Sequence, residues 1–315
     1  MELRIRENTY HLPDVLIVGA AKSGTTSLHH YLRSTPGFFL PAHKEPYFFS
    51  FMDAPPAFTS PEPLTGVVHD LADYAALFDD ATPGDLLGDA SPSYLYTHDT
   101  AIANVRRLYG EKIRDLTVII LLRDPVARAW SQVSHFKKFD HEPLPPEEAV
   151  LPETIERRMQ AGWNIFYDYV GFGRYADQVT AWRDAVPKTR VWLFDDLRSD
   201  PAKLVDEVIE FARPGWTERP DNLETSFNIS GKPKRGAAGI LWSIAYRDNP
   251  AKRLAARLVP KRVKDGLYER LSHRVLERHP VTEAFRERLA PVFRDDIERL
   301  EDVLGRDLSH WTFNT

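Results

Sequence analysis

The chain has 315 residues, no cysteine and a net charge of −5. At about 100–200 residues per domain, this length allows one large or two modest domains. Because cysteine is absent, disulfide frameworks, thiolate metal sites and a cysteine nucleophile are all excluded. The mildly acidic balance, with 46 acidic and 41 basic residues, gives no global reason to expect a nucleic-acid partner.

The start of the sequence predicts no targeting segment. Residues 1–7 are charged and contain no long apolar stretch, unlike a secretory signal peptide. The longest purely apolar run, Val118 to Leu122, is much shorter than the roughly 20 residues that cross a membrane. We therefore expect a cytoplasmic protein without a transmembrane segment, in agreement with the missing cysteines.

Strand-like and helix-like patterns alternate along residues 14–212. Short apolar runs predict buried strands at 14–18, 86–88, 116–122 and 190–194. Helical patterns are found at 25–34, 101–109, 175–185, 201–211 and from about 240 onward, with Gly305 ending the last helix. Proline-rich segments predict loops at 54–66 and 141–152. The alternation is typical of a doubly wound α/β sheet.

The run from Leu116 to Leu122 is the clearest predicted strand. Its residues are β-branched or aliphatic without alternation, as in parallel strands that are covered on both faces. Asp124-Pro125 then predicts a helix start, with Asp as the N-cap and Pro at the first helical position. Asp200-Pro201 repeats this device, so Asp124 is better explained as a cap than as a metal ligand.

The loop after the first predicted strand has the composition of an anion site. Gly19 ends the strand, and a helix follows from Thr25, so loop amides and the helix N-terminus point at the same place. A Walker A loop would carry lysine directly after its second glycine, Gly24, but Thr25 stands there. The lysine is Lys22, inside the loop, where it can reach the bridging oxygen of a phosphate ester. The hydroxyl groups that add donors belong to Ser23, Thr25 and Thr26.

A second anion-binding pair is predicted at the end of the central strand. Arg123 directly follows that strand, at the edge where open α/β sheets bind ligands, and Ser131 lies about two turns into the next helix. A guanidinium fork with a neighbouring hydroxyl suits a terminal phosphate. Arg123 also occupies the position where a P-loop kinase has its magnesium-binding aspartate, which argues against that class.

Taken together, these motifs resemble those of sulfotransferases that use 3′-phosphoadenosine-5′-phosphosulfate (PAPS). Lys22 to Thr26 is similar to the family's loop for the 5′-phosphosulfate, and Arg123 with Ser131 is similar to its 3′-phosphate pair. Asn228 to Arg235 resembles a basic loop that closes over the 3′-phosphate, and Gly171 to Tyr175 with Trp182 resembles another family helix. The cofactor-binding residues implied are Lys22, Ser23, Gly24, Thr25, Thr26, Arg123, Ser131, Tyr175, Gly231, Lys232 and Arg235.

The resemblance covers nearly the whole chain, and Leu300 to Trp311 is similar to bacterial members. It implies one α/β domain over residues 1–315, related to P-loop kinases. The domain would contain a parallel sheet of about five strands flanked by helices. A helical C-terminal extension would cover about residues 240–315.

The resemblance also implies a chemistry, which is sulfuryl transfer from PAPS to a hydroxyl or amine with release of PAP. Lys22 would neutralise the oxygen that leaves sulfur, and no metal ion would be required. His43 to Phe49 resembles a segment whose glutamate is the general base in several carbohydrate sulfotransferases, which implies Glu45. Asp89 is a second candidate, although relatives usually carry Glu-Lys where this chain has Asp-Ala. Cytosolic members use a histidine, for which the alternatives are His43, His98 and His135.

The sequence does not distinguish between a small molecule, a lipid and a carbohydrate as the acceptor. Aromatic residues at 47–51 and 163–169 could line its pocket or belong to the core. The basic tract from Arg247 to His279 could contact an anionic acceptor or a membrane surface, although a solvated helix face is the simpler explanation. The alternative functions are a P-loop kinase that uses Mg-ATP and a non-catalytic nucleotide-binding protein.

Overall fold

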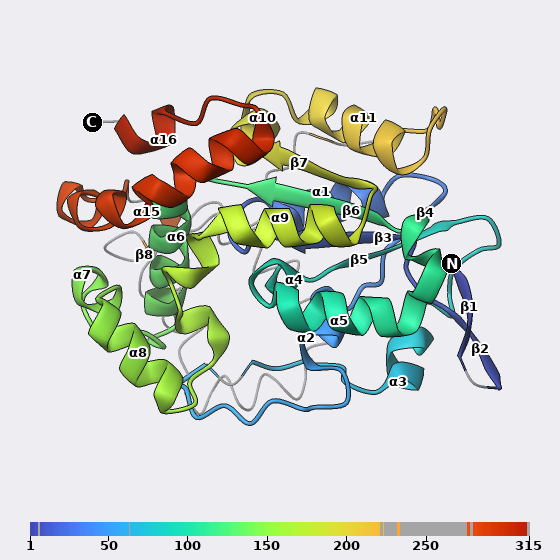
Figure 1. Cartoon of the computed structure of the whole chain (residues 1–315), viewed down its shortest axis with the longest axis horizontal. Helices are drawn as coiled ribbons and strands as arrows, with labels where there is room; N and C mark the ends of the chain where they lie inside the picture. The colour runs from blue at the N-terminus through green and yellow to red at the C-terminus, as the bar shows by residue number, and fades with distance from the viewer. Residues whose placement is uncertain are drawn as a thin grey trace.

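A computed structural model describes residues 1–5, 7–62, 64–220, 223, 232–233, 276–277 and 280–313. Its centre is a parallel five-stranded sheet, as the sequence predicted (Figure 1). In spatial order the strands are β4 (Phe38–Phe39), β5 (Leu86–Ala90), β3 (Val15–Gly19), β6 (Thr117–Leu122) and β7 (Thr189–Leu193). The chain completes β4 and β5 on one side of β3 before it crosses to β6 and β7. The carboxyl end of β3 is therefore a topological switch point, where open α/β sheets bind ligands.

The two central strands are buried on both faces. Every residue of β3 and β6 is buried, and Val15 pairs with Thr117 in parallel register. Alternate residues serve different cores: Leu16 and Val18 belong to one cluster, whereas Val15 and Ile17 belong to the other. This division explains why the sequences of both strands are apolar without alternation.

Helices cover both faces of the sheet. One face packs against α1 (Thr25–Arg33), α10 (Phe194–Ser199) and α11 (Pro201–Ala212). The other carries α4 (Ser93–Tyr96), α5 (His98–Tyr109), α6 (Pro125–Lys138), α9 (Tyr175–Ala185) and α15 (Glu283–Leu304). Figure 1 shows α4, α5 and α9 on the near face of the sheet. None of the helices in the described ranges is long and apolar enough to cross a bilayer.

Shorter elements complete the described chain. An N-terminal hairpin, which the sequence did not predict, is formed by β1 (Glu2–Ile5) and β2 (Asn8–His11). Two further short strands pair antiparallel, β8 (Lys232–Pro233) and β9 (Leu276–Glu277). The remaining helices are α2 (Phe48–Phe51), α3 (Leu71–Ala76), α7 (Pro146–Ala149), α8 (Pro152–Gln160) and α16 (His310–Phe313), with 3₁₀ turns η1 (Gly110–Arg114), η2 (Ile165–Tyr167) and η3 (Gly171–Gly173).

The predicted helix caps are confirmed. The Asp124 carboxylate accepts a hydrogen bond from the Val126 amide at 2.9 Å, and Asp200 accepts one from the Lys203 amide at 2.9 Å. Gly305 ends α15 with a φ of 62°, in the left-handed region that favours glycine. Helix starts of this kind are predictable because the signal lies within three residues of the helix end.

Two predictions about local structure are wrong. The segment 141–152 is not one continuous loop, because Pro146 and Pro152 occupy the first turns of α7 and α8. Proline is favoured at that position, so here it starts helices instead of excluding them. The strand β7 is also not fully buried: it lies at the edge of the sheet, and Arg190 is exposed.

A buried ion pair holds the connection between α6 and α8. Both Glu142 oxygens accept hydrogen bonds from Arg158, at 2.7 and 2.9 Å, and the Tyr169 hydroxyl donates to the same carboxylate at 2.6 Å. The two side chains are almost completely buried, so each depends on the other to offset its lost hydration.

Replacing Glu142→Gln should destabilise the protein by about 3 kcal/mol, because the Arg158 charge would remain buried without an ionic partner. Urea denaturation monitored by tryptophan fluorescence would measure this. Glu156→Gln is the matched control, since Glu156 is exposed on α8 and should change stability by less than about 0.5 kcal/mol. Equal effects of the two substitutions would contradict the importance of the buried pair.

Candidate active site

A cavity of about 280 Å³ lies at the carboxyl ends of β3 and β6, where the sequence predicted the nucleotide site. The residues after β3 contribute one wall, and Arg123 directly follows β6. Of the catalytic and cofactor-binding residues proposed from sequence, those that line the cavity are Lys22, Gly24, Thr25, Thr26, Glu45, Arg123, Ser131 and the alternative base His135. Three others, Ser23, Asp89 and Tyr175, are buried but do not line it.

Gly24 starts α1 in a way that leaves amide donors for an anion. Its φ is 94°, and no side chain caps the helix. A Cβ at this position would lie 2.7 Å from Leu197 Cδ2, so both the backbone and the space favour glycine. The first turn of α1 also carries no acidic residue. Its amide groups and its dipole therefore present a positive site to the cavity.

Lys22 brings a cation into the same place. Its φ is 69°, an uncommon left-handed conformation for a residue with a side chain. The pKa of the Lys22 ammonium is lowered to about 8, chiefly by burial. The neighbouring cations Lys138, Lys44 and Arg123 also lower it, whereas the Glu45 carboxylate raises it. The ammonium is thus cationic at neutral pH, and a bound anion would stabilise that form.

Arg123 and Ser131 also line the cavity. The Arg123 guanidinium donates a hydrogen bond to the Lys22 carbonyl at 3.1 Å and lies 4.9 Å from the ring centre of Phe194. Ser131 is buried on α6 and lines the cavity. The Tyr175 hydroxyl donates to the Arg123 carbonyl at 3.0 Å, so Tyr175 fixes the end of β6 instead of lining the cavity.

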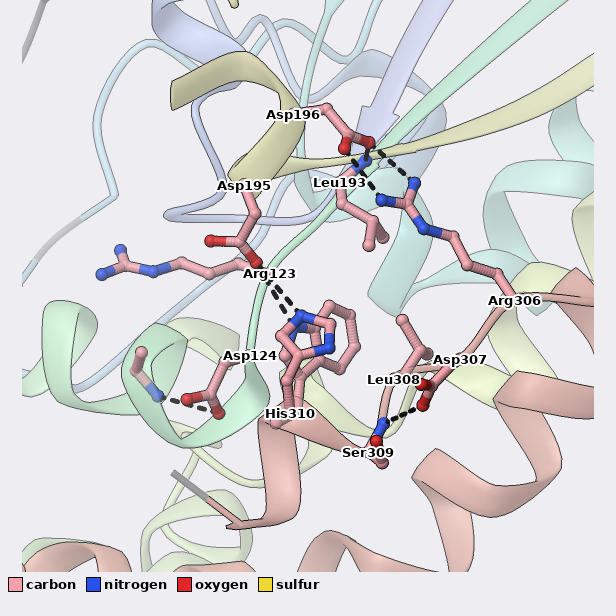
Figure 2. A network of polar contacts seen from close by, with 12 residues as sticks. Arg123, Asp124, Leu193, Asp195, Asp196, Arg306, Asp307, Leu308, Ser309 and His310 are labelled. Carbon is pink, nitrogen blue, oxygen red and sulfur yellow. Dashed lines mark hydrogen bonds and ion pairs between the residues drawn. The ribbon is translucent and has the colours of Figure 1, made fainter. Parts of the chain in front are cut away.

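The C-terminal segment supports this side of the site. Figure 2 shows Arg306 beside Asp196 on α10, with two hydrogen bonds at 2.7 and 2.8 Å. His310 lies 3.7 Å from Asp195 on the same helix. Because Phe194 begins α10 and lines the cavity, these contacts hold the ring against which Arg123 packs.

Glu45 supplies a carboxylate to the cavity that Lys22 lines. Glu45 and Tyr47 have φ values of 61° and 57°, and strained backbone of this kind clusters at functional sites. The Tyr47 hydroxyl donates to Glu45 at 2.7 Å, and Lys44 forms an ion pair with it. Burial opposes ionisation, but Lys44, Tyr47 and Lys22 together hold the pKa of the Glu45 carboxyl below its usual value. It is therefore ionised at neutral pH and able to accept a proton.

Asp89 has a different environment. Its carboxylate accepts hydrogen bonds from Tyr74 at 2.8 Å, Tyr94 at 2.7 Å and Ser91 at 3.0 Å. Burial raises the pKa of the Asp89 carboxyl, although these three donors act against the shift. The Ser91 hydroxyl in turn accepts a hydrogen bond from the Tyr47 amide at 3.2 Å. Asp89 is thus connected to the strained segment that carries Glu45.

The three histidines differ clearly in position. His135 lines the cavity, and burial together with Lys22 and Lys138 lowers the pKa of its imidazole well below the usual value. His43 is exposed and contacts the Gly66 carbonyl at 2.9 Å, and His98 lies beside the exposed Asp99. The sequence contained a signal for His135, since it lies one helical turn after Ser131 on the same face of α6.

Two further lining residues, Glu62 and Asn164, had no sequence signal because they lie in irregular segments. The aromatic segments belong largely to the core, and of their core residues Tyr47 and Phe166 also line the cavity, whereas Phe48, Phe49, Tyr167 and Tyr169 do not. Gly231, Arg235 and the tract 247–279, apart from the backbone of 276–277, lie outside the described residues. The backbone of Lys232 is described, in a short strand that contacts α6.

Comparison with known proteins agrees with this geometry. The sulfotransferase domain family matches residues 12–223. A sulfotransferase from Alicyclobacillus acidocaldarius has a similar structure, with a TM-score of 0.69 and 25% identity over 96% of this chain and 99% of that one. The fold relationship therefore extends beyond the matched domain.

Curated relatives include the membrane-associated sulfotransferase kil1 of Dictyostelium discoideum, 30% identical over 46% of this chain and 30% of that protein. Human heparan sulfate glucosamine 3-O-sulfotransferase 3A1 is 27% identical over 67% of this chain and 47% of that protein. The chain thus spans at most about half the length of these two relatives. Since the domain family covers well over half of the sequence, this chain belongs to the sulfotransferase family, whose members use PAPS and release PAP.

Proposed function

We propose that the chain is a PAPS-dependent sulfotransferase, which moves a sulfuryl group to a hydroxyl or amine of an acceptor and releases PAP. The observation that carries this proposal is that Lys22 and Glu45 line one cavity at the start of α1. A cation for a leaving oxygen and a base for an acceptor proton are thereby available in one space. Relatives named for heparan sulfate glucosamine support a carbohydrate among the possible acceptors.

The donors on the nucleotide side fit the two ends of PAPS. The amides of Gly24, Thr25 and Thr26, together with Lys22, suit the 5′-phosphosulfate, because a helix N-terminus and an ammonium favour an anion there. Arg123 and Ser131 suit the 3′-phosphate. The fully buried Ser23 shapes the loop from behind the cavity wall. We assign Gly231, Lys232 and Arg235 to the 3′-phosphate from the family resemblance alone.

The proposed reaction balances without a redox partner. PAPS supplies a sulfuryl group bound through an oxygen to phosphorus. The acceptor oxygen or nitrogen forms a bond to sulfur, the bond from sulfur to the bridging oxygen breaks, and its electron pair leaves with PAP. Glu45 takes the proton of the acceptor, and Lys22 stabilises the charge on the leaving oxygen. His135, neutral in the same cavity, is the second candidate base. Asp89 acts as a positioning residue through Ser91 and Tyr47.

Two observations disfavour the alternative functions. Asp124 is engaged as the cap of α6 and lies 3.1 Å from Arg286, so it is not arranged as the magnesium ligand of a kinase. The left-handed backbone at Lys22, Glu45 and Tyr47 converges on one cavity, which argues against a mere scaffold. We further propose one catalytic domain, because the lining residues come from segments between residues 21 and 194 and α15 packs on α6 and α9.

Differential melting separates the sulfotransferase from the kinase. PAP in millimolar excess without metal should raise the melting temperature, since a ligand at 100 times its dissociation constant stabilises by about 2.7 kcal/mol. Mg-ATP at the same concentration should have a clearly smaller effect. Stabilisation by Mg-ATP with no response to PAP would overturn the proposed function.

Replacing Glu45→Gln should lower kcat by roughly 10²- to 10⁴-fold, because the amide cannot accept the acceptor proton. The shift in melting temperature with PAP should remain, since Glu45 does not contact the nucleotide in this proposal. Glu111→Gln, at an exposed position, is the matched control and should leave kcat unchanged. Loss of PAP stabilisation along with kcat would assign Glu45 to nucleotide binding instead of catalysis.

The pH dependence of kcat/KM for PAPS should report Lys22. Its pKa is lowered to about 8 in the free protein, so the cationic form is lost as pH rises through that value. Glu45 loses its base form only at a pH below the usual carboxyl range, because its pKa is lowered. We therefore expect a plateau near pH 6–7 and a fall above about pH 8. In Lys22→Arg the fall should move to higher pH, and an unchanged profile would show that another group titrates.

A further inference from the structure

The cavity has a second side that the nucleotide does not account for. Tyr47, Glu62, Asn164 and Phe166 form this side, which we call the acceptor wall. They come from three segments that are far apart in sequence, and contacts between those segments hold them together. The rings of Tyr47 and Phe166 meet edge to face with centres 6.0 Å apart. The Ser60 hydroxyl accepts a hydrogen bond from the Asn164 amide at 3.1 Å, and Thr59 bonds the Ala161 carbonyl at 2.7 Å.

Asn164 presents a donor that its surroundings leave unused. The side chain is fully buried, and its Oδ1 accepts a hydrogen bond from the Phe166 amide at 3.0 Å. That bond fixes which end of the carboxamide is oxygen. Its Nδ2 has no hydrogen-bond partner within the described part of the chain. A buried donor without a hydrogen-bond partner is unfavourable. Because Asn164 lines the cavity, we expect an oxygen of a bound ligand to accept this hydrogen bond.

Glu62 supplies the complementary acceptor. Its carboxylate lines the same cavity and forms an ion pair with His141, which does not line it. An ionised carboxylate only accepts hydrogen bonds, whereas the Asn164 Nδ2 only donates them. A hydroxyl group does both, so a donor and an acceptor on one wall match a hydroxyl or a pair of neighbouring hydroxyls. The flanking rings of Tyr47 and Phe166 match the apolar face of a sugar ring.

The charges on the acceptor wall select against polyanions. Glu62 is acidic, and Glu45 lies beside Tyr47 at the edge of this wall. The described cations that line the cavity, Lys22 and Arg123, are on the nucleotide side. Lys44 is already paired with Glu45. Sulfate or carboxylate groups on an acceptor would therefore meet like charges in a confined space, which is unfavourable.

We propose that the acceptor is an uncharged, hydroxyl-rich group such as a neutral sugar or polyol, held by Asn164 and Glu62 against the adjoining rings of Tyr47 and Phe166. This inference rests on the proposed sulfuryl transfer. It narrows the acceptor to a class that differs from the heparan sulfate for which several relatives are named. Glu62 and Asn164 are specificity residues in this account, whereas Glu45 remains the base.

Acceptor preference provides the first test. The protein would be assayed with labelled PAPS against octyl β-glucoside, methyl α-mannoside and inositol as neutral probes, and heparosan as the polyanionic probe. We expect at least one neutral probe to be sulfated with a kcat/KM at least ten-fold above that of heparosan. Preference for heparosan, or sulfation of no neutral probe, overturns the inference. Stabilisation by PAP is measured in parallel, so that a failure of the inference can be distinguished from a failure of the proposed function.

Three variants separate acceptor contact from structural support. Glu62→Gln removes the charge, and Asn164→Ser removes the Nδ2 donor while keeping a side-chain oxygen that can cap the Phe166 amide. His141→Gln is the matched control, because it breaks the ion pair of Glu62 without changing the cavity lining. We expect the first two to raise the acceptor KM roughly ten-fold, with the KM for PAPS within about two-fold of the parent value.

The control decides how Glu62 acts. His141→Gln should leave both KM values within about two-fold of the parent values. If His141→Gln raises the acceptor KM as much as Glu62→Gln does, then Glu62 acts only by stabilising its own segment through the ion pair with His141, and the inference is overturned for that residue. If Asn164→Ser leaves the acceptor KM unchanged while PAP still stabilises the variant, Asn164 does not contact the acceptor.

Discussion

The poor hydration of the Lys22 ammonium at the cavity is the constraint on which the rest of the site depends. A poorly hydrated charge is tolerated only with compensating partners, and the described partner of opposite sign is Glu45, on a separate segment. The fold must therefore hold the loop after β3 and the segment before α2 in fixed positions. It does so through the pairing of β3 with β6, the bond from Arg123 to the Lys22 carbonyl and the bond from Tyr47 to Ser91. Strained backbone at Lys22, Glu45 and Tyr47 is the conformational cost of this arrangement.

Local signals explain why the sequence could predict that the loop after β3 and Arg123 meet at one cavity, the proposed nucleotide side. The strand β3, the glycine turn and the start of α1 lie within one short segment, and their order alone implies an anion site. Arg123 directly follows an apolar strand. The proline after Asp124 indicates that Asp124 is the N-cap of a helix. The parallel sheet of about five strands followed from the family resemblance and the alternation of elements, whereas its strand order was not predicted. The glycine turn, Arg123 and the Asp124 cap have in common that each is determined by neighbours in sequence.

On the acceptor side the sequence predicted only that the aromatic segments 47–51 and 163–169 could line a pocket, and Tyr47 and Phe166 do line the cavity. The polar residues of this side could not be predicted because packing between distant segments brings them together. Glu62 and Asn164 have no periodicity around them, and they meet only because Thr59 and Ser60 bond to residues 161 and 164. Packing between distant segments also decides the role of Asp89. The family resemblance suggested a base there, but the Asp89 carboxylate already accepts hydrogen bonds from the hydroxyls of Tyr74, Tyr94 and Ser91. The proline-rich segment 141–152 was misjudged for a local reason, since proline both breaks and begins helices.

The interaction of Lys22 with Glu45 at one cavity also explains how a single cation can serve the whole proposed reaction. In the free protein the Glu45 carboxylate partly offsets the charge of Lys22. In the proposed transfer, Glu45 loses its negative charge as it takes the acceptor proton, and negative charge develops on the leaving oxygen near Lys22. The ammonium therefore keeps an anionic partner from the first step to the last, which a low-dielectric site requires. An uncharged acceptor leaves this exchange undisturbed, because it brings neither an anion that would compete for Lys22 nor a cation that would compete for Glu45.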